Sequence, residues 1–359
     1  MKTLLITLDF LPNRGGVSNY YYNIFKNFPD NELVILTNVK GEESKNIIRK
    51  NLNFGIFHFF NTLKEIKNII KQEKIEHILV GNILPIGKFA YFIKKSLKIN
   101  YCIFIHGLDI KLAQNKFFKK FLTKKILDNA KTIFANSEST KSIIKTKTPI
   151  KIIYPGINEN FNNINQEKKL KIIKKYNLDG KKIILTVGRV VKRKNHEFII
   201  RAISELKNEF NNLIYLIVGT GNNLEYLKNL TKNNKNIIFL GEINDDELPY
   251  FYSICDIFAM ISRETKNDTE GFGIVYLEAA LFKKPAIAAN SGGAKEAVID
   301  NESGILINNE NLEELKNAIK KLITDEDFKN QLGEKAYKRV IENFTWQKIT
   351  HKLIQELNA

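Results

Sequence analysis

Short apolar segments alternate with amphipathic segments along this chain, and the whole alternation occurs twice. The apolar segments are residues 4–8, 33–36, 78–80, 101–105 and 132–135 in the first half, and 183–187, 214–218, 237–240, 257–260 and 286–289 in the second. Buried strands separated by helices are typical of a parallel sheet with crossover helices. The pattern therefore predicts an α/β protein with two doubly wound, Rossmann-like domains in tandem.

The domain junction is predicted at residues 154–158, where Pro155 and Gly156 interrupt both periodicities. A chain of 359 residues is long enough for two domains of ordinary size. We therefore expect a first domain over 1–158 and a second over 159–344. The tail, 345–359, has a helical period and follows a completed sheet pattern.

Cysteine content and hydropathy bear on the compartment. Cys102 and Cys255 are the only cysteines, and each lies in an apolar run. Two distant thiols of this kind indicate a reducing compartment, and no metal-ligand spacing of Cys and His is present. The N-terminal apolar run predicts a first strand, not a signal peptide, and no apolar stretch approaches the ~20 residues of a spanning helix. We expect a cytoplasmic protein, soluble or peripheral to a membrane.

Positive charge is concentrated in the first half of the chain. Residues 1–155 contain 26 Lys and Arg against 11 Asp and Glu, a net of +15, whereas residues 156–359 contain 30 against 28, a net of +2. Such asymmetry suggests an anionic partner for the first half, which is a membrane surface, a nucleic acid or an acidic substrate. No nucleic-acid-binding motif accompanies the charge, so a nucleic acid is the least favoured of the three.

A polar loop after the apolar segment 257–260 closes on residues 271–273, Gly-Phe-Gly, where a helix-like run begins. Free N–H groups and the positive end of the helix dipole make such a start an anion site suited to a diphosphate. Glu270 and Glu278 lie on either side of this cradle, which suits a nucleotide sugar, with the ribose on one carboxylate and the transferred sugar on the other. The alternative is ordinary packing, because glycines at helix starts and solvated helical glutamates are both common.

The run from 263 to 293 resembles the donor-binding motif of the retaining GT-B glycosyltransferases of family 4. It has the pattern Glu, seven residues, Glu, with Gly-Phe-Gly between and Ser-Gly-Gly following. The resemblance covers essentially the whole chain. It implies a GT-B fold with two domains facing a cleft, a final helix that crosses back to the first domain, and retaining transfer of a hexose from a nucleotide sugar.

Two cations of the predicted site lie in the basic loop 188–195, after the first strand of the second domain. Arg189 and Lys194 match the cations that hold the donor diphosphate in the family. Preorganised cations stabilise the charge that grows on a departing diphosphate. No Asp-x-Asp at a strand end indicates a divalent cation, so we expect neither a metal nor a resident cofactor. A plain, exposed basic loop is the alternative, and we expect Lys194 to be exposed there.

His106 follows an apolar segment at the sheet edge where open parallel sheets bind ligands. The resemblance implies that His106 lies near the transferred sugar and that Asp109 orients its ring, although a lone histidine is more often structural. With Arg189, Lys194 and Glu270 it completes the predicted catalytic set. The predicted donor-binding residues are Gly15, Gly16, Gly219, Ile243, Gly271, Phe272, Gly273, Ile274, Val275 and Glu278, and the predicted acceptor side comprises Asp109, Asn136 and Ser137.

The donor and the acceptor are predicted less sharply. Residues 267–278 and 291–296 resemble lipid-directed mannosyltransferases most, so the resemblance implies GDP-mannose, with UDP-hexoses as the alternative. The acceptor is a lipid-linked glycan, a lipopolysaccharide core or a growing polysaccharide, as in cell-envelope glycan synthesis. A non-transferring GT-B enzyme, such as a nucleotide-sugar epimerase or a phosphorylase, and a nucleic-acid-binding protein remain as alternatives.

Residues 111–131 are predicted to form a helix with aromatic and basic sides. Phe117, Phe118, Phe121, Leu122 and Ile126 share one face at 100° per residue. Lys116, Lys119, Lys120 and Lys124 fall opposite, with Lys125 the exception. In one interpretation the Phe face packs on the sheet and the lysines meet water. In the other, part of the Phe face meets lipid and the lysines reach anionic head groups, which predicts an enzyme peripheral to the inner leaflet of the cytoplasmic membrane.

Overall fold

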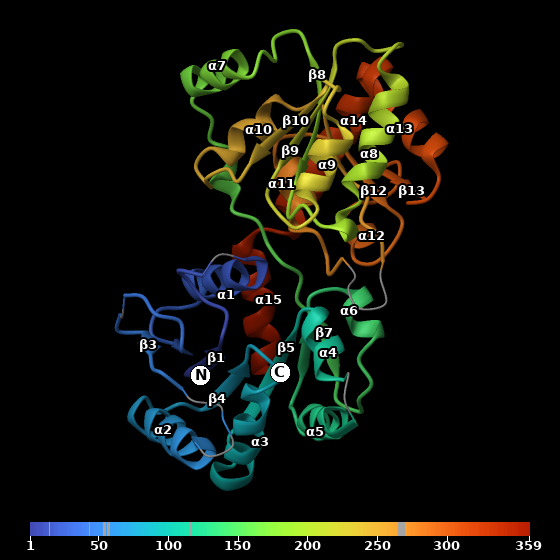
Figure 1. The fold of residues 1–359 in the computed structure, drawn as a ribbon. Helices are drawn as coiled ribbons and strands as arrows, with labels where there is room; N and C mark the ends of the chain where they lie inside the picture. The colour runs from blue at the N-terminus through green and yellow to red at the C-terminus, as the bar shows by residue number, and fades with distance from the viewer. Residues whose placement is uncertain (14, 43, 53–54, 56–57, 115–116, 265–269) are drawn as a thin grey trace. The chain divides into compact units, whose positions relative to one another are not determined.

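The computed structural model describes residues 1–13, 15–42, 44–52, 55, 58–114, 117–264 and 270–359 (Figure 1). They form two compact units. The first unit is Met1–Gly156 together with Trp346–Ala359, and the second unit is Ile157–Thr345. Each contains one parallel sheet with helices on its faces, so the two Rossmann-like domains expected from the sequence are confirmed.

The sheet of the first unit has seven parallel strands in the order β3-β2-β1-β4-β5-β6-β7. They are β1 (Thr3–Thr7), β2 (Leu33–Thr37), β3 (Ile47–Arg49), β4 (His77–Val80), β5 (Asn100–Ile105), β6 (Ile133–Ala135) and β7 (Ile150–Ile152). The sequence pattern missed β3 and β7, the two edge strands. Each has only three residues and none of them is fully buried, so neither shows the continuous apolar run of a central strand.

Helices cover both faces of this sheet. The connections through α2 (Phe59–Gln72), α3 (Ile86–Leu97) and α5 (Phe117–Asp128) all advance in the same direction along it, so right-handed crossovers place them on one face. The connection through α1 (Gly16–Asn27) runs the other way, to the opposite face. There α1 contacts α15 (Trp346–Asn358), which confirms that the final helix packs on the first domain (Figure 1).

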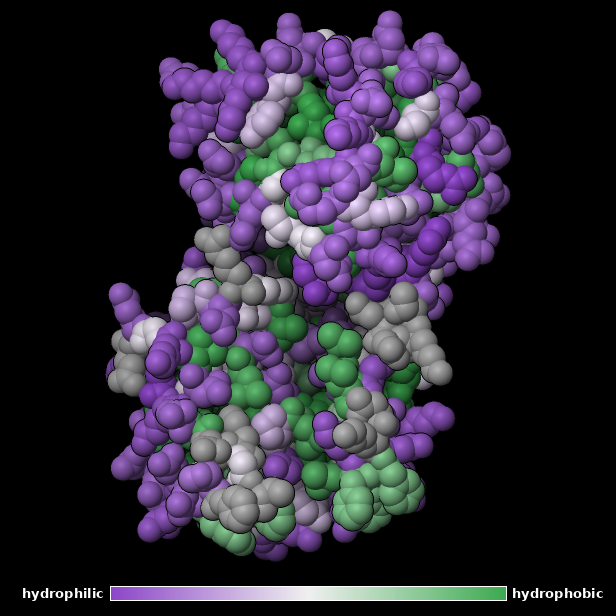
Figure 2. Space-filling model, viewed as in Figure 1, coloured by the Kyte–Doolittle hydropathy of each residue, from purple (hydrophilic) through white to green (hydrophobic). Residues whose placement is uncertain are grey.

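The helix predicted over 111–131 is two helices, α4 (Leu108–Ala113) and α5, and residues 115–116, including Lys116, lie outside the described ranges. Thr123, Ile126 and Leu127 form the buried side of α5. Of the two interpretations of this helix, the one in which the Phe face packs on the sheet is wrong for three of its residues, because Phe117, Phe118 and Phe121 are 87%, 86% and 58% exposed. These rings form a pale green patch over α5 in Figure 2.

The sheet of the second unit has six parallel strands in the order β10-β9-β8-β11-β12-β13. They are β8 (Lys182–Val187), β9 (Leu213–Val218), β10 (Ile237–Gly241), β11 (Ile257–Met260), β12 (Ala286–Ala289) and β13 (Gly304–Ile307). Its helices are α7 (Gln166–Lys175), α8 (His196–Leu206), α9 (Leu224–Leu230), α10 (Leu248–Ile254), α11 (Ile274–Leu281), α12 (Ala294–Ala297), α13 (Leu312–Thr324) and α14 (Glu326–Asn343). The carboxyl ends of β8, β9, β10 and β11 lead into the loops that carry the predicted donor residues of this unit.

The length and polarity of the helices also bear on membrane insertion. Within the part of the chain that the structure describes, every helix is too short or too polar to cross a bilayer.

Candidate functional site

The glycine-rich loop of the second unit joins β11 to α11. Gly273 caps α11 with a φ of +89°, in the left-handed region that favours glycine. The segment that follows β12 lies directly against this loop, and the Gly293 N–H donates to the Glu270 carbonyl at 2.9 Å. A Cβ on Gly293 would overlap the carbonyl oxygen of Gly271. The Gly-Gly pair after Ser291 is therefore required for this close approach of two backbones.

The start of α11 has the properties of an anion site. No side chain caps it, so the amides of Ile274 and Val275 do not donate to a cap residue, and both residues are only partly buried. Phe272 is buried, with its ring 5.7 Å from that of Phe344. Phe272 therefore serves the loop through packing, and only its backbone can face a ligand.

A single carboxylate oxygen gathers the charged groups beside this loop. Oε2 of Glu270 lies 2.7 Å from the Lys194 Nζ, 2.9 Å from an Arg193 guanidinium nitrogen and 3.0 Å from the Ser262 hydroxyl, which donates to it. Lys194 also approaches the Met260 sulfur at 3.0 Å. Loops after β8 and β11 thus meet in one buried ion-pair network.

Burial and charge act in opposite directions in this network. Burial alone would raise the pKa of Glu270, but the charges and hydrogen bonds of Lys194 and Arg193 outweigh it and hold that pKa at about 2. Burial lowers the pKa of Lys194, and Glu270 opposes this shift. The expectation that Lys194 is exposed is wrong, because the residue is 8% exposed. Arg189 is exposed and forms no ion pair with any described residue.

Arg193 and Ser262 are members of the network that the sequence did not single out. Arg193 precedes Lys194 in the same 3-10 turn, Lys192–Lys194, and Ser262 follows β11 by two residues. The one feature of the sequence that could have identified Arg193 is its position next to the predicted Lys194. Nothing in the sequence shows which of three consecutive cations turns inward.

Glu278 lies in the second turn of α11, where the Tyr252 hydroxyl donates to its Oε2 at 2.6 Å. Burial raises the pKa of Glu278 to about 7, although the Tyr252 hydrogen bond opposes the shift. Tyr252 is held in turn by stacking on Phe282, with ring centroids 5.8 Å apart. In its ionised form this carboxylate can accept hydrogen bonds at both oxygens, whereas protonation turns one of the two oxygens into a donor.

The loops after β8, β9 and β10 also contact one another. A Cβ on Gly219 would overlap the carbonyl oxygen of Gly188, and Gly219 has a φ of +126°. Its N–H donates to the Gly241 carbonyl at 2.7 Å. The half-buried Ile243 follows two residues later. The structure therefore brings Gly219 close to the basic loop, and places Ile243 on the neighbouring loop.

At the rim of the first unit, Gly15 and Gly16 begin α1, and a Cβ on either would meet no atom within 4 Å. His106 follows β5, and its Nε2 lies 2.8 Å from the Tyr21 hydroxyl. That hydroxyl donates its one proton to the Gly81 carbonyl at 2.7 Å. His106 must therefore carry its proton on Nε2, which leaves Nδ1 as an acceptor. Burial lowers the pKa of His106 to about 4, so the ring is neutral at pH 7.

Asp109 does not orient the His106 ring, contrary to expectation. Its Oδ1 accepts hydrogen bonds from the backbone amides of His106, at 3.1 Å, and Ile110, at 2.9 Å. Its Oδ2 is buried and has no hydrogen-bond partner, and burial raises its pKa to about 6. Asn136 contacts the His106 carbonyl at 3.5 Å. Ser137 is fully buried and caps the short helix α6 (Glu138–Ser142).

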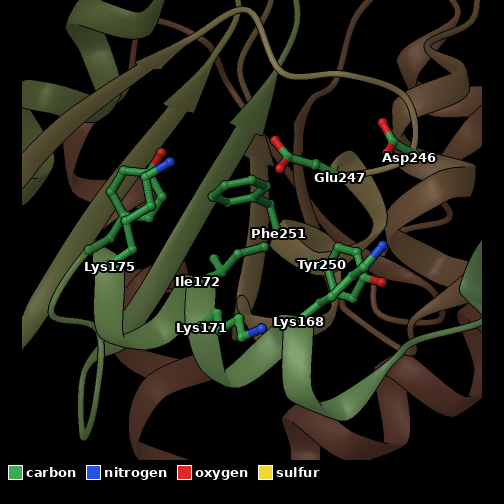
Figure 3. A pocket seen from close by; sticks show the side chains of 9 residues that line it. Lys168, Lys171, Ile172, Lys175, Asp246, Glu247, Tyr250 and Phe251 are labelled. Carbon is green, nitrogen blue, oxygen red and sulfur yellow. The ribbon is translucent and has the colours of Figure 1, made fainter.

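A cavity of about 320 Å³ lies elsewhere in the second unit, between α7 and α10 (Figure 3). Lysines from α7 and the carboxylates of Asp246 and Glu247 line it, and its aromatic part comprises Tyr176, Tyr250 and Phe251. Because its walls carry opposite charges, it has no clear preference for an anion or a cation. None of the predicted donor residues lines it. Across the described ranges, no three His, Cys, Asp or Glu side chains are placed to hold a metal ion.

Comparison with known proteins gives consistent results for both units. The family model for glycosyl transferases group 1 matches residues 168–339, and that for glycosyltransferase family 4 matches residues 14–161. An uncharacterized glycosyltransferase of Methanocaldococcus jannaschii is 30% identical over 372 residues, covering 100% of this chain and 99% of the relative.

Two further proteins are similar over the whole length. A GDP-mannose-dependent alpha-(1-6)-phosphatidylinositol monomannoside mannosyltransferase of Mycobacterium tuberculosis is 23% identical, covering 100% of this chain and 98% of the relative. Among solved structures, Anabaena HepE in complex with UDP superposes with a TM-score of 0.84 at 19% identity, covering 100% of both chains. The similarity to Anabaena HepE, at this low sequence identity, is a similarity of fold.

Proposed function

Because this chain belongs to the family 4 glycosyltransferases and has their GT-B fold, we propose that it transfers mannose, with retention, from GDP-mannose to a lipid-linked or polysaccharide acceptor in cell-envelope glycan synthesis. The observation that carries the proposal is the convergence of Lys194 and Arg193 on Glu270 beside the uncapped start of α11. GDP-mannose is favoured because the mycobacterial relative is named as dependent on it.

The donor diphosphate would accept hydrogen bonds from the backbone amides at the start of α11 and form ion pairs with Lys194 and Arg189. Negative charge grows on the diphosphate as the bond to the sugar breaks, and fixed cations stabilise it most at that moment. Glu270 would accept hydroxyl hydrogen bonds from the transferred sugar and Glu278 those from the ribose. The nucleotide sugar is a co-substrate, and we propose no resident cofactor or metal.

Retention without a covalent intermediate is supported by the state of Glu270. Three donors converge on its Oε2, and its pKa of about 2 makes it a weak base and a weak nucleophile. We therefore propose front-face substitution, in which the departing phosphate assists removal of the acceptor proton.

The acceptor would be reached at an anionic membrane surface. Phe117, Phe118 and Phe121 of α5 are exposed together with Lys119, Lys120 and Lys124. Interfacial helices combine such rings and lysines. We propose that the enzyme is cytoplasmic and binds the inner leaflet through α5, and that its basic charge serves lipid and not nucleic acid.

A thermal-shift screen tests the donor. A nucleotide sugar at about 100 times its dissociation constant adds about 2.7 kcal/mol to the free energy of unfolding. GDP and GDP-mannose should raise the unfolding temperature more than UDP and UDP-glucose do. A larger shift with UDP and UDP-glucose would identify a UDP sugar as the donor, and the assignment as a glycosyltransferase would stand.

Product analysis tests the reaction. Incubation with GDP-mannose should give a new glycoside only when acceptor lipid is present, and NMR of that product should show the α-anomeric configuration of the donor. Conversion of the donor sugar without any acceptor would identify an epimerase instead. A β-linked product would contradict retention.

A further inference from the structure

Exposed large hydrophobic side chains gather on the helices of the first unit. Besides the three rings of α5, they include Phe60 on α2, 79% exposed, and Phe92 on α3, 43% exposed. Leu108 and Leu112 of α4 are also exposed. The second unit, by contrast, exposes only three such residues within the described ranges: Leu170, Tyr226 and Leu230.

Phe60 and Phe92 belong to one aromatic cluster. The Phe59 ring lies 5.5 Å from Phe60 and 5.2 Å from Phe92, in edge-to-face contacts, and it stacks on the buried Phe89 at 4.8 Å. Phe59 thus holds its two neighbours on the core while their own rings remain in water. Large exposed apolar surface held by a rigid base is typical of an interaction site.

This cluster and the rings of α5 lie on the same side of the first unit. Helix α2 contacts α3 and α3 contacts α5, on one face of the sheet. Figure 1 shows the three helices at one end of the unit, and Figure 2 shows pale green side chains at that end. A flat surface approaching this end can therefore meet both groups of rings.

The charge of these helices selects the partner. Helix α3 contains three lysines and no acidic residue, and α5 contains four lysines and one acidic residue, Asp128. The exposed Lys95 lies over the Tyr91 ring at 4.7 Å, next to Phe92. With the net charge of +15 on residues 1–155, this favours an anionic apolar surface, which is a bilayer with anionic lipid.

We propose that Phe60 and Phe92 form a second membrane anchor, so that α2, α3 and α5 together dock the first unit on an anionic lipid bilayer. This inference rests on the proposed docking of α5 and extends it from one helix to a two-part surface. Two anchors fix the orientation of the unit on the membrane, whereas one helix would allow it to rotate.

Tryptophan reporters test the second anchor directly. The single native tryptophan, Trp346, is buried and gives a constant background. Phe60→Trp and Phe118→Trp should each shift their emission to the blue when vesicles of phosphatidylcholine and phosphatidylglycerol are added, and Tyr226→Trp in the second unit should not. A shift for Phe118→Trp without one for Phe60→Trp would overturn the proposal and leave the α5 anchor standing.

Vesicle sedimentation of the full chain gives the second measurement. Phe60→Gln with Phe92→Gln should weaken binding at least tenfold, because partial burial of two rings is lost. The matched control, Tyr226→Gln with Leu230→Gln, should bind as wild type does. Unchanged binding of the Phe60/Phe92 variant would refute the second anchor.

Two controls distinguish lipid binding from self-association and from damage to the donor site. If the Phe60/Phe92 variant instead abolishes a concentration-dependent dimer measured by sedimentation velocity without vesicles, the surface binds a second copy and the proposal fails. The thermal shift by GDP-mannose is measured in the same variant and should be unchanged. Loss of vesicle binding with a normal nucleotide shift therefore tests the surface independently of the transferase assignment.

Discussion

The two units differ in how they hold the polar groups that follow the carboxyl ends of their strands, which form the rim of each unit. In the second unit, Lys194 and Arg193 are ionised partners of Glu270 and are largely buried with it. In the first unit, His106 is neutral and is fixed by the uncharged Tyr21 hydroxyl. The second unit therefore holds paired full charges around Glu270, whereas the first unit presents the neutral ring of His106.

This difference matches the two halves of a glycosyl transfer. A nucleoside diphosphate carries charge that increases during the reaction, so its site benefits from fixed cations. An acceptor or sugar hydroxyl is neutral and is bound by single hydrogen bonds. In the second unit Glu270 balances the charges of Lys194 and Arg193, and a diphosphate would compete with it for Lys194.

The largest effect is expected for Lys194→Ala. Loss of one charge-stabilising group should lower turnover by roughly 10²–10³. Because Lys194 is buried, the change should also lower the free energy of unfolding by about 1–3 kcal/mol. Steady-state kinetics and urea unfolding measure the two effects separately.

Lys192→Ala is the matched control for this prediction. Lys192 belongs to the same 3-10 turn but is exposed and forms no ion pair with the residues that the structure describes. It should change turnover by less than about twofold, since exposed charges contribute little. Equal effects of the two variants would mean that the loop acts through its net charge and that the buried position has no special role.

Glu270→Gln should destabilise the fold by about 3 kcal/mol, because Lys194 and Arg193 lose their buried counter-charge. Since the pKa of Glu270 is lowered to about 2, its contribution to stability is present above its ordinary pKa of 4.5 and is lost as the pH falls toward 2. Urea unfolding at pH 7 and at pH 3 should show a smaller difference between wild type and variant at pH 3.

Ligand binding to Glu270→Gln sharpens the comparison further. The variant should bind the nucleoside diphosphate at least as well as wild type, because Lys194 is released, yet transfer the sugar poorly. Calorimetry showing weaker binding of the diphosphate would place Glu270 on the nucleotide instead of the sugar.

The sequence predicted the parts of the fold that have strong periodicity. Every central strand coincides with a predicted apolar segment to within one residue at each end, because buried parallel strands are continuously apolar. The short edges β3, β7 and β13 were missed, and β13 begins with a glycine. The break between α4 and α5 was also missed, since both sides of it have a compatible helical period.

The candidate site was predicted in composition but not in geometry. The motif located Glu270, Glu278 and the glycines, and the backbone overlaps at Gly219 and Gly293 give physical reasons for those glycines. Sequence could not show that Lys194 turns inward, because the direction of a loop side chain depends on tertiary partners. Nor could it show that Tyr21, 85 residues away, holds the His106 ring.

Glu278 should make nucleotide binding depend on pH near neutrality. Protonation of Glu278 turns one of its two acceptor oxygens into a donor and removes the charge that strengthens the hydrogen bonds, so affinity for the nucleoside diphosphate should fall as the pH is lowered through about 7. Glu278→Gln should weaken binding by about 1.5–3 kcal/mol and remove this pH dependence. Calorimetry from pH 6 to pH 8 measures both, and a pH dependence that persists in the variant would assign it to another group.

Glu278 makes the free energy of unfolding depend on pH in the opposite direction to Glu270. Its folded pKa is raised from 4.5 to about 7, so the folded protein holds the additional proton between these values. Stability from this group is therefore lost as the pH rises through about 7. The two glutamates of one motif thus respond to pH in opposite directions.

The smallest effect is expected at the neutral rim, for Tyr21→Phe. Burial raises the pKa of the Tyr21 hydroxyl, which therefore keeps its proton and donates it to the Gly81 carbonyl. Wild-type His106 should then be the Nε2–H tautomer, visible in the ¹⁵N shifts of its ring. Loss of the hydroxyl leaves both tautomers accessible and should lower kcat/KM about fivefold, corresponding to one hydrogen bond of about 1 kcal/mol.

Tyr20→Phe is the matched control, because the Tyr20 hydroxyl is also buried but donates to the Ile153 carbonyl and not to the ring. It should leave the His106 shifts unchanged, and an Nδ1–H tautomer in the wild type would contradict the hydrogen-bond assignment.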